Sequence, residues 1–318
     1  DQILSSSFKK INSELQSVNL NFMAKISLKS LFKESFRLRK RYNKYILKNP
    51  YSNKVSLNKP VFVIGLPRSG TTYLHNLLIH FLDRDGFKFW ELTEPIPYLN
   101  NKFLDQKFRK FRAFILLSLS KIFVPKLQLM HPVKLDSYEE CWHLFKNSLN
   151  IYNIIFQFNF SGFGEWVKEN NMSKAYKEYS DFIKILSIER NKKDLVLKCP
   201  DHVIFYDLIY NNFDNPKIVW IHRDPVKVIS SYSSMMFEVQ KFFLKSASKK
   251  SIGKFVFDKF FYMINEGQKI RENQDISIID INYSDIKDNP QKSIIKIANQ
   301  CDLKIKNNNP FGTIKKLG

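Results

Sequence analysis

Cysteine is scarce in this chain, with three residues in 318, at Cys141, Cys199 and Cys301. They are odd in number and far apart, and none belongs to a CxxC or Cys/His ligand spacing. Disulfide frameworks and structural zinc sites depend on such spacings, so neither is indicated and we expect no metal. Because unpaired cysteines are typical of reducing compartments, we expect a cytoplasmic location.

Long apolar runs are also missing. The longest candidate, residues 113–124, is shorter than the roughly 18 to 20 residues of a membrane span and contains Lys121. The sequence therefore predicts no membrane-spanning helix. The chain begins at Asp1 and not at a methionine, so an upstream signal or anchor that has been removed stays an open alternative.

Acidic residues are outnumbered, with 30 Asp and Glu against 51 Lys and Arg, which gives a formal net charge of +21. Such an excess indicates an acidic partner, which can be a nucleotide, an anionic membrane or a nucleic acid. The same excess also fits a chain that is simply rich in Lys, Asn, Ile, Phe and Tyr, so charge alone does not choose a function. At 318 residues and 44% hydrophobic, the chain can bury a substantial core.

A short turn separates two different hydrophobic periods in the first quarter of the chain. Residues 61–64 (VFVI) form an apolar run that is typical of a buried parallel strand. From Thr71 onward, leucines recur at helical spacing. The turn between them, residues 65–70 (GLPRSG), leads a strand into a helix N-terminus, where unpaired backbone N–H groups favour an anion. We therefore predict an anion-binding loop.

This loop lacks the lysine that a nucleotide-triphosphate P-loop requires. Gly65 and Gly70 have the GxxxxG spacing of that motif. Thr72 fits its Ser/Thr position, but Thr71 stands where the lysine belongs. The charge is supplied instead by Arg68, and an arginine fork binds tetrahedral oxyanions in a bidentate way. A P-loop nucleotide kinase or nucleotidase stays an alternative.

Strand and helix patterns alternate along the rest of the chain. Short apolar runs predict further strands, at residues 87–92, 195–198, 217–222 and 276–283. Helical spacing, capping residues and Asx-Pro pairs predict helices, at residues 101–130, from Ser137, at 173–190, at 201–212, and from Pro225 and Pro290. This order predicts an α/β fold of three layers, with a mostly parallel central sheet and helices on both faces.

We divide the chain into a basic helical N-terminal arm, residues 1–50, and a single α/β domain, residues 51–318. A helical cap is inserted in that domain at about residues 101–190. The arm is expected to pack on the domain with a solvated basic face, the alternative being a membrane-surface helix. Between residues 101 and 130 we expect most of the apolar side chains in the core, the alternative being that they line an acceptor pocket.

A second distinctive stretch is residues 218–231, IVWIHRDPVKVISS. Arg223 leaves a predicted strand where a helix begins, and Ser231 lies two turns along that helix. Both can therefore face the carboxyl edge of the sheet, where such sheets bind ligands. Together with PRSGTT at residues 67–72, these residues resemble those of the broad bacterial-type sulfotransferase family, which uses 3′-phosphoadenosine 5′-phosphosulfate (PAPS).

Three further segments resemble that family in the usual order: YEECW at 138–142, LKCPDH at 197–202 and the Tyr-x-Asp segment within 282–286. Cys199 replaces the serine of the family's Lys-Ser-Pro-x-His segment. The resemblance covers about residues 60–300 and implies a sulfotransferase topology like that of the P-loop NTPases.

The resemblance also implies how PAPS would be held. The residues that would contact its 5′-phosphosulfate lie in the loop: Arg68, Ser69, Gly70, Thr71 and Thr72. Arg223 and Ser231 would hold its 3′-phosphate. Arg68 would offset charge on the bridging oxygen as that oxygen becomes the leaving group.

Sulfuryl transfer to a hydroxyl also needs a base that takes the proton of the acceptor. Some branches of the family use a glutamate downstream of the loop arginine. Glu91 lies 23 residues after Arg68 and is the predicted base, with Glu94 as the near alternative. Other branches use histidine, which makes His131 the second candidate. Lys198 ends an apolar strand, where an unpaired ammonium is costly, so we expect it to meet an anion and to stabilise the phosphosulfate or the transition state.

The expected partner is a small-molecule or lipid-like acceptor with a hydroxyl, or less often an amine, because the insertion is rich in aromatic residues. His202 is a weaker candidate for contact with the ligands. An anionic membrane surface is a further expected partner, and no nucleic acid is expected. A competing hypothesis is a non-catalytic basic protein that binds anionic membrane or nucleic acid through residues 25–48.

Overall fold

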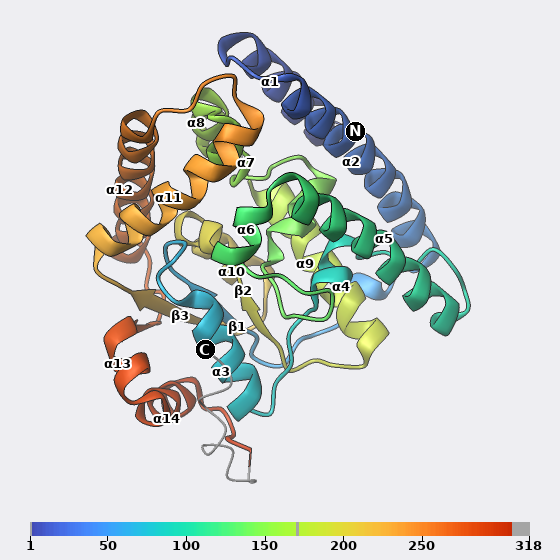
Figure 1. Cartoon of the computed structure of the whole chain (residues 1–318). Helices are drawn as coiled ribbons and strands as arrows, with labels where there is room; N and C mark the ends of the chain where they lie inside the picture. Colours follow the sequence, from blue (N-terminus) through green and yellow to red (C-terminus); the bar gives the residue numbers. More distant parts are fainter. Residues whose placement is uncertain (1, 170–171, 307–318) are drawn as a thin grey trace.

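Four parallel strands form the centre of the molecule, in the spatial order β2-β1-β3-β4 (Figure 1). The computed structural model describes residues 2–169 and 172–306. The bounds of the strands are β1 Val61–Ile64, β2 Val196–Lys198, β3 Lys217–His222 and β4 Ile278–Asn282. Since β1 pairs with β2 on one side and β3 on the other, the carboxyl ends of three neighbouring strands meet at one edge of the sheet.

Alternating side chains divide the core into two layers on opposite faces of this sheet. In β1, Val61 and Val63 pack in one hydrophobic cluster while Phe62 and Ile64 pack in the other. The first cluster is closed by α3 (Thr71–Phe81), α13 (Tyr283–Asp288) and α14 (Pro290–Cys301). The second is closed mainly by α9 (Ser173–Arg190), α10 (Tyr206–Asn212), α11 (Pro225–Phe243) and α12 (Lys249–Asn273). The predicted three-layer α/β fold with a parallel sheet is confirmed.

The remaining helices precede β1 or lie in the segment between α3 and β2, except one that follows β2. Before β1 come α1 (Gln2–Ser17), α2 (Phe22–Lys48) and the short 3₁₀ helix η1 (Ser52–Lys54). Between α3 and β2, besides α9, lie α4 (Phe89–Thr93), α5 (Lys102–Phe123), α6 (Pro125–Met130), the 3₁₀ helix η2 (Cys141–Asn147), α7 (Ile154–Phe158) and α8 (Ser161–Glu169). The 3₁₀ helix η3 (Pro200–Ile204) follows β2.

The two N-terminal helices lie along the outside of the domain (Figure 1). In α2, the guanidinium of Arg39 donates to Glu178 of α9 at 2.7 Å, and the hydroxyl of Tyr42 donates to Asp181 at 2.7 Å. Arg39 and Glu178 are both buried. The arm is therefore docked on α9 by buried polar contacts.

Two sequence-based element predictions are wrong. Residues 87–92 do not form a strand, because the carboxylate of Glu91 accepts the backbone N–H of Lys88 and starts α4 there. Ser137 does not begin a helix, since its hydroxyl donates to the carbonyl of Lys134 within a turn. The 3₁₀ helix η2 begins only at Cys141.

The prediction for residues 101–130 is also wrong in one respect. The fully buried stripe of α5 consists of Asp105, Arg109, Ala113 and Leu117, so half of it is charged. The phenylalanines of this helix are largely exposed. Arg109 makes the inward orientation stable by donating to Glu189 at 2.7 Å and to the carbonyl of Glu94 at 2.6 Å.

Candidate active site

The loop from Gly65 to Gly70 joins β1 to α3 and contains three residues with positive φ. The φ angles are 147° for Gly65, 70° for Arg68 and 100° for Gly70. Gly70 is the N-cap of α3 and provides no side-chain cap, so the first N–H groups of this helix are left for another acceptor. The positive end of the helix therefore opens at the carboxyl edge of the sheet.

The predicted loop hydroxyls take different positions. The hydroxyl of Ser69 is buried and donates to the carbonyl of Leu66 at 2.6 Å, which tightens the turn. Thr71 is the first residue of α3 and is buried, while the hydroxyl of Thr72 accepts a hydrogen bond from Lys198 at 3.0 Å. The hydroxyl of Ser69 thus stabilises the turn from inside the core, and the hydroxyl of Thr72 connects the start of α3 to β2.

We expect Gly70→Ala to destabilise the protein by more than about 1 kcal/mol, because an L side chain is strained at this φ. In addition, the new Cβ would lie 2.4 Å from the ring of Tyr283. Gly253→Ala is the matched control, since Gly253 is inside α12 with nothing within 4 Å of the added carbon. There the change should be neutral or stabilising. Urea denaturation of both variants measures this, and an equal effect at the two sites would contradict the role of the loop conformation.

Arg68, Arg223 and Ser231 converge above this loop. The Nε of Arg68 donates to the hydroxyl of Ser231 in α11 at 3.2 Å, and the Nη1 of Arg223 donates to the carbonyl of Arg68 at 2.8 Å. The guanidinium of Arg223 also lies over the ring of Tyr283, 4.4 Å from its centre. Residues separated by more than 150 positions in the sequence thus form one cationic group at the ends of β1 and β3.

This cationic group has no carboxylate partner. Within residues 2–169 and 172–306, neither Arg68 nor Arg223 forms an ion pair with Asp or Glu. Burial, and next the charge of Arg223, lower the pKa of Arg68. Two neighbouring guanidinium groups that repel each other suit a ligand with more than one negative charge.

Lys198 lies at the end of β2, fully buried, and is surrounded by anionic groups of the chain itself. Its Nζ donates to Glu140 at 3.1 Å and lies 3.7 Å from Glu139. Burial opposes the charge on Lys198, but these two carboxylates outweigh burial and raise its pKa above the ordinary value. A charged lysine is therefore held directly beside Thr72, in the first turn of α3 after the loop.

His131 joins this cluster from the other side. It follows α6, and its Nε2 lies 3.6 Å from Glu139. Burial disfavours the imidazolium, but the interaction with Glu139 is stronger and the pKa of His131 is raised. The carbonyl of the preceding Met130 accepts a hydrogen bond from Arg68 at 2.8 Å. His131, Glu139, Lys198 and Thr72 thus form a continuous polar chain that ends at the anion-binding loop.

A model of the sulfotransferase family matches residues 60–307. The chain belongs to the sulfotransferase family. It is an enzyme, a transferase that moves a sulfuryl group, and the kinase alternative is not favoured. A comparison with curated protein sequences finds no match.

Two solved sulfotransferase structures share this fold. The crystal structure of sulfotransferase STF1 from Mycobacterium tuberculosis H37Rv has a TM-score of 0.81 and 18% sequence identity, and the match covers 99% of this chain and 87% of that one. The crystal structure of sulfotransferase STF9 from Mycobacterium avium has a TM-score of 0.76 and 17% identity, with 94% and 77% covered.

The contacts of Glu91 lie away from the cluster around this sulfotransferase's loop. Its Oε2 accepts the N–H of Lys88 at 2.7 Å and lies 3.4 Å from Arg190. Burial is the main influence and raises the pKa of Glu91 although Arg190 opposes the shift. Glu94 pairs with Arg112 at 2.9 Å and with Arg41. Glu91 is thus held by the start of α4 and by Arg190 of α9, and Glu94 is held by α5 and α2.

Sequence reasoning missed Glu139, Glu140 and Tyr283 as members of the site. For the two glutamates a signal was present, because a lysine at the end of an apolar strand requires an anionic partner. His202, in contrast, is fully buried between the hydroxyls of Tyr176 and Tyr179, and burial lowers its pKa to about 3. It therefore acts as a neutral core residue.

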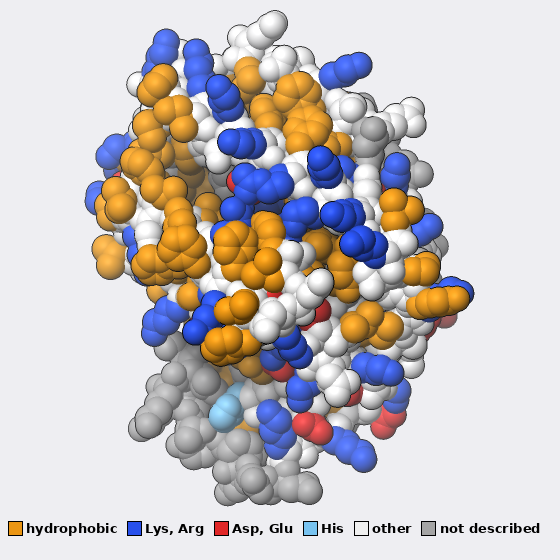
Figure 2. Space-filling view, turned by 90° about the vertical axis from the view of Figure 1, so that its right-hand side faces the viewer, with side chains coloured by type: hydrophobic (Ala, Val, Ile, Leu, Met, Phe, Trp, Pro, Cys, Tyr) orange, Lys and Arg blue, Asp and Glu red, His pale blue; other side chains and the backbone are white. Residues whose placement is uncertain are grey.

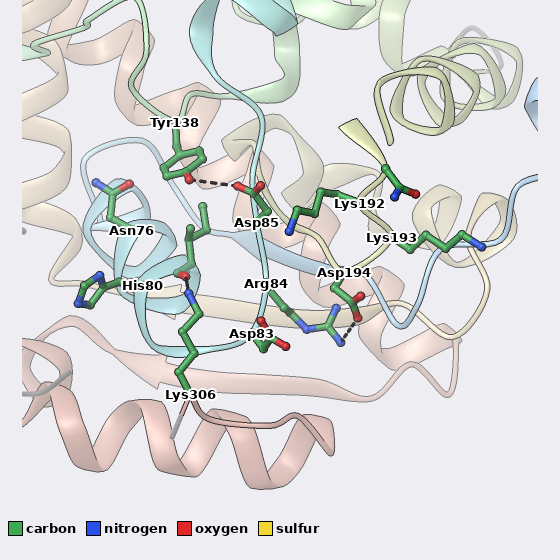
Figure 3. Close-up of a pocket in the computed structure, with 12 residues that line it drawn as sticks. Asn76, His80, Asp83, Arg84, Asp85, Tyr138, Lys192, Lys193, Asp194 and Lys306 are labelled. Carbon is green, nitrogen blue, oxygen red and sulfur yellow. Dashed lines mark hydrogen bonds and ion pairs between the residues drawn. The ribbon is translucent and has the colours of Figure 1, made fainter. Parts of the chain in front are cut away.

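A polar cavity of about 580 Å³ lies at the opposite, amino-terminal edge of the sheet (Figure 3). It is bounded by the end of α3 and by the segment that leads into β2, and its lining includes Asp83, Arg84, Asp85, Lys192 and Asp194. Tyr138 and Arg190 bind Asp85, and Arg84 lies 3.9 Å from Asp194. None of the residues predicted to bind PAPS lies in it.

Within the described ranges, no group of three or more His, Cys, Asp or Glu side chains is arranged to hold a metal ion. The candidate site brings together main-chain N–H groups, two guanidinium groups and one ammonium.

Proposed function

We propose that this sulfotransferase uses PAPS as donor and binds it between the loop and α11. The observation that carries the proposal is the convergence of Arg68, Arg223 and Ser231, with no carboxylate counter-ion among the residues that the structure describes. When bound, PAPS supplies the activated sulfuryl group and two separate phosphate positions. The start of α3 and Arg68 would hold the 5′ side, and Arg223 with Ser231 would hold the 3′-phosphate.

Lys198 and Arg68 have distinct tasks in this proposal. Arg68 lies in the loop and would compensate negative charge where the leaving phosphate forms. Lys198 is held in place by Glu140 and Thr72, so it would offer a fixed donor to the sulfuryl oxygens without reorganisation. Because it is buried, water does not screen its charge.

The acceptor in this proposal is a small molecule with a hydroxyl, and a lipid-like alcohol is the favoured class. It would approach between α6 and the cluster formed by Lys198, Glu139 and His131. The test is transfer of labelled sulfate from PAPS to a panel of sterol, lipid, phenol and sugar acceptors. Transfer to none of these acceptors, by a protein that does not bind 3′,5′-adenosine bisphosphate, would refute the proposal.

Glu91 and His131 are the two candidates for the general base, and the pH dependence of kcat/KM separates them. If His131 takes the proton, activity falls as the pH falls through its raised pKa, and the acidic limb lies above 6.5. Glu139→Gln should then move this limb to lower pH, since the carboxylate raises that pKa. If Glu91 is the base, the limb lies in the acidic range of a carboxyl group instead, and Glu139→Gln leaves it in place.

Two isosteric variants complete this test. His131→Asn should reduce kcat by about 10²- to 10⁴-fold if the histidine is the base, the usual contribution of a general base. Glu91→Gln keeps an oxygen that can accept the N–H of Lys88 at the α4 cap, and removes the basicity together with the charge that faces Arg190. The variant that loses activity while its melting temperature stays near that of the parent protein identifies the base.

A further inference from the structure

Helix α5 carries charged residues on its inner face and aromatic residues on its outer face. Asp105 and Arg109 are 3% and 1% exposed, whereas Phe103 and Phe111 are 64% and 60% exposed. A surface helix of a water-soluble domain normally has the reverse arrangement, with the apolar stripe toward the core. The outer face of α5 is therefore built for a neighbour that is less polar than water.

This surface, which we call the α5–α6 face, extends along both helices. Its most exposed members are Phe103, Leu104, Phe111, Phe114, Ile122 and Leu129. With 22 residues, α5 is about 33 Å long, so the apolar side chains form an extended stripe and not isolated contacts. Figure 2 shows hydrophobic side chains with Lys and Arg between them over this side of the molecule.

The charge on the α5–α6 face has one sign. Between residues 102 and 130 the only acidic residue is Asp105, and it is buried. Lys102, Lys107 and Lys121 are exposed and have no carboxylate within ion-pair distance in the described part of the chain. The ammonium of Lys107 lies 4.2 Å from the centre of the Phe103 ring, so cations and aromatic rings are directly interleaved.

We propose that the α5–α6 face docks this enzyme on the surface of anionic lipid membranes. Aromatic side chains would enter the boundary between headgroups and acyl chains, while the lysines meet the lipid phosphates. No helix in residues 2–169 or 172–306 is long and apolar enough to cross a membrane. In this proposal α5 would lie in the plane of the interface, with its aromatic face toward the lipid. A row of unpaired lysines beside the aromatic stripe favours a lipid surface over a second copy of this equally basic chain.

The docking face is continuous with the candidate active site. Leu129 is 85% exposed at the end of α6, and the next residue, Met130, accepts the hydrogen bond from Arg68. An enzyme docked in this way would present the site beside His131 to the lipid surface. The inference about docking does not depend on the proposed donor, because it rests on α5 and α6 alone.

The test is co-sedimentation of the full chain with vesicles of phosphatidylcholine, with and without phosphatidylglycerol. We expect binding to the vesicles that contain phosphatidylglycerol and roughly tenfold or more weaker binding after Phe111→Ser combined with Ile122→Ser. The matched control is Phe257→Ser combined with Phe261→Ser, since these rings are 52% and 60% exposed on α12, outside the face. This control should bind like the parent protein.

A second variant tests the charges. Replacing Lys102, Lys107 and Lys121 by Gln should reduce binding to anionic vesicles about fivefold per lysine. Added salt should also weaken the binding of the parent protein, because it screens these charges. Equal losses in the α12 control, or no vesicle binding at low salt, would overturn the proposal. So would self-association of the parent protein that the Phe111→Ser, Ile122→Ser variant abolishes in sedimentation velocity, because a second copy would then cover the face. Unchanged melting temperatures establish that the variants are folded.

Discussion

Arg223→Ala should remove most of the thermal stabilisation that 3′,5′-adenosine bisphosphate gives to the protein. At 100 times its dissociation constant, this ligand would stabilise the native state by about 2.7 kcal/mol, which corresponds to a shift of roughly 4 °C for a chain of this length. Losing the charge-assisted hydrogen bonds to one phosphate weakens binding on the order of 100-fold. The shift at the same ligand concentration then falls to about 1 °C.

Two controls separate recognition from loss of charge. Arg37→Ala removes a cation from α2, where Arg37 pairs with the neighbouring Glu34 in the same helix, and should leave the shift unchanged. Arg223→Lys keeps the charge but loses the planar fork, so an intermediate shift is expected. If Arg223→Ala keeps the full shift, the 3′-phosphate is bound elsewhere and the proposed orientation of the donor is wrong.

The sequence was informative where a local pattern determines local structure. The apolar run before Gly65, the helical spacing after Thr71 and the Asp224-Pro225 pair correctly predicted β1, α3 and the start of α11. Arg68, Arg223 and Ser231 could be placed near one another because parallel strands end at a common edge. Their direct contacts agree with that expectation.

The sequence was less informative where tertiary contacts decide the outcome. Glu91 lies in a segment that reads as a strand, yet its carboxylate bonds to the N–H of Lys88 and the chain turns into a helix. Similarly, the residues around Arg109 do not predict that its side chain points inward, because its partner Glu189 is 80 residues away in the sequence. In both places a long-range or capping contact outweighs local propensity.

Lys198 shows the same limit inside the active site. Its position at the end of an apolar strand predicted an anionic partner, and a bound phosphosulfate was the expected one. The structure places Glu140 and Glu139 beside its ammonium, and they belong to a segment some 60 residues earlier in the chain. The buried lysine therefore has a structural partner and a proposed catalytic task, and an experiment has to separate the two.

Lys198→Met should lower the free energy of unfolding by about 3 to 5 kcal/mol, because it leaves the buried carboxylate of Glu139 and the partly buried carboxylate of Glu140 without this cation. Sulfate transfer should fall on the order of 10²- to 10³-fold, the usual loss for one fixed electrostatic contact to a transition state. Urea denaturation and the transfer assay measure these two effects separately. The control is Arg39→Met, which breaks the buried ion pair between Arg39 of the arm and Glu178 of α9. This variant should be less stable, but the folded protein should transfer sulfate as before.

A second substitution in the same pair distinguishes the two roles of Lys198. In the combination of Lys198→Met with Glu140→Gln, one uncompensated charge is removed, so part of the lost stability should return. Sulfate transfer should not return, because the ammonium beside Thr72 is still missing. The pKa of Lys198 is raised and that of Glu139 is lowered, so both stay charged across neutral pH. Their stabilising contribution is lost only as the pH rises through the raised lysine pKa or falls through the lowered glutamate pKa. If the double variant recovers sulfate transfer together with stability, Lys198 has a structural role alone.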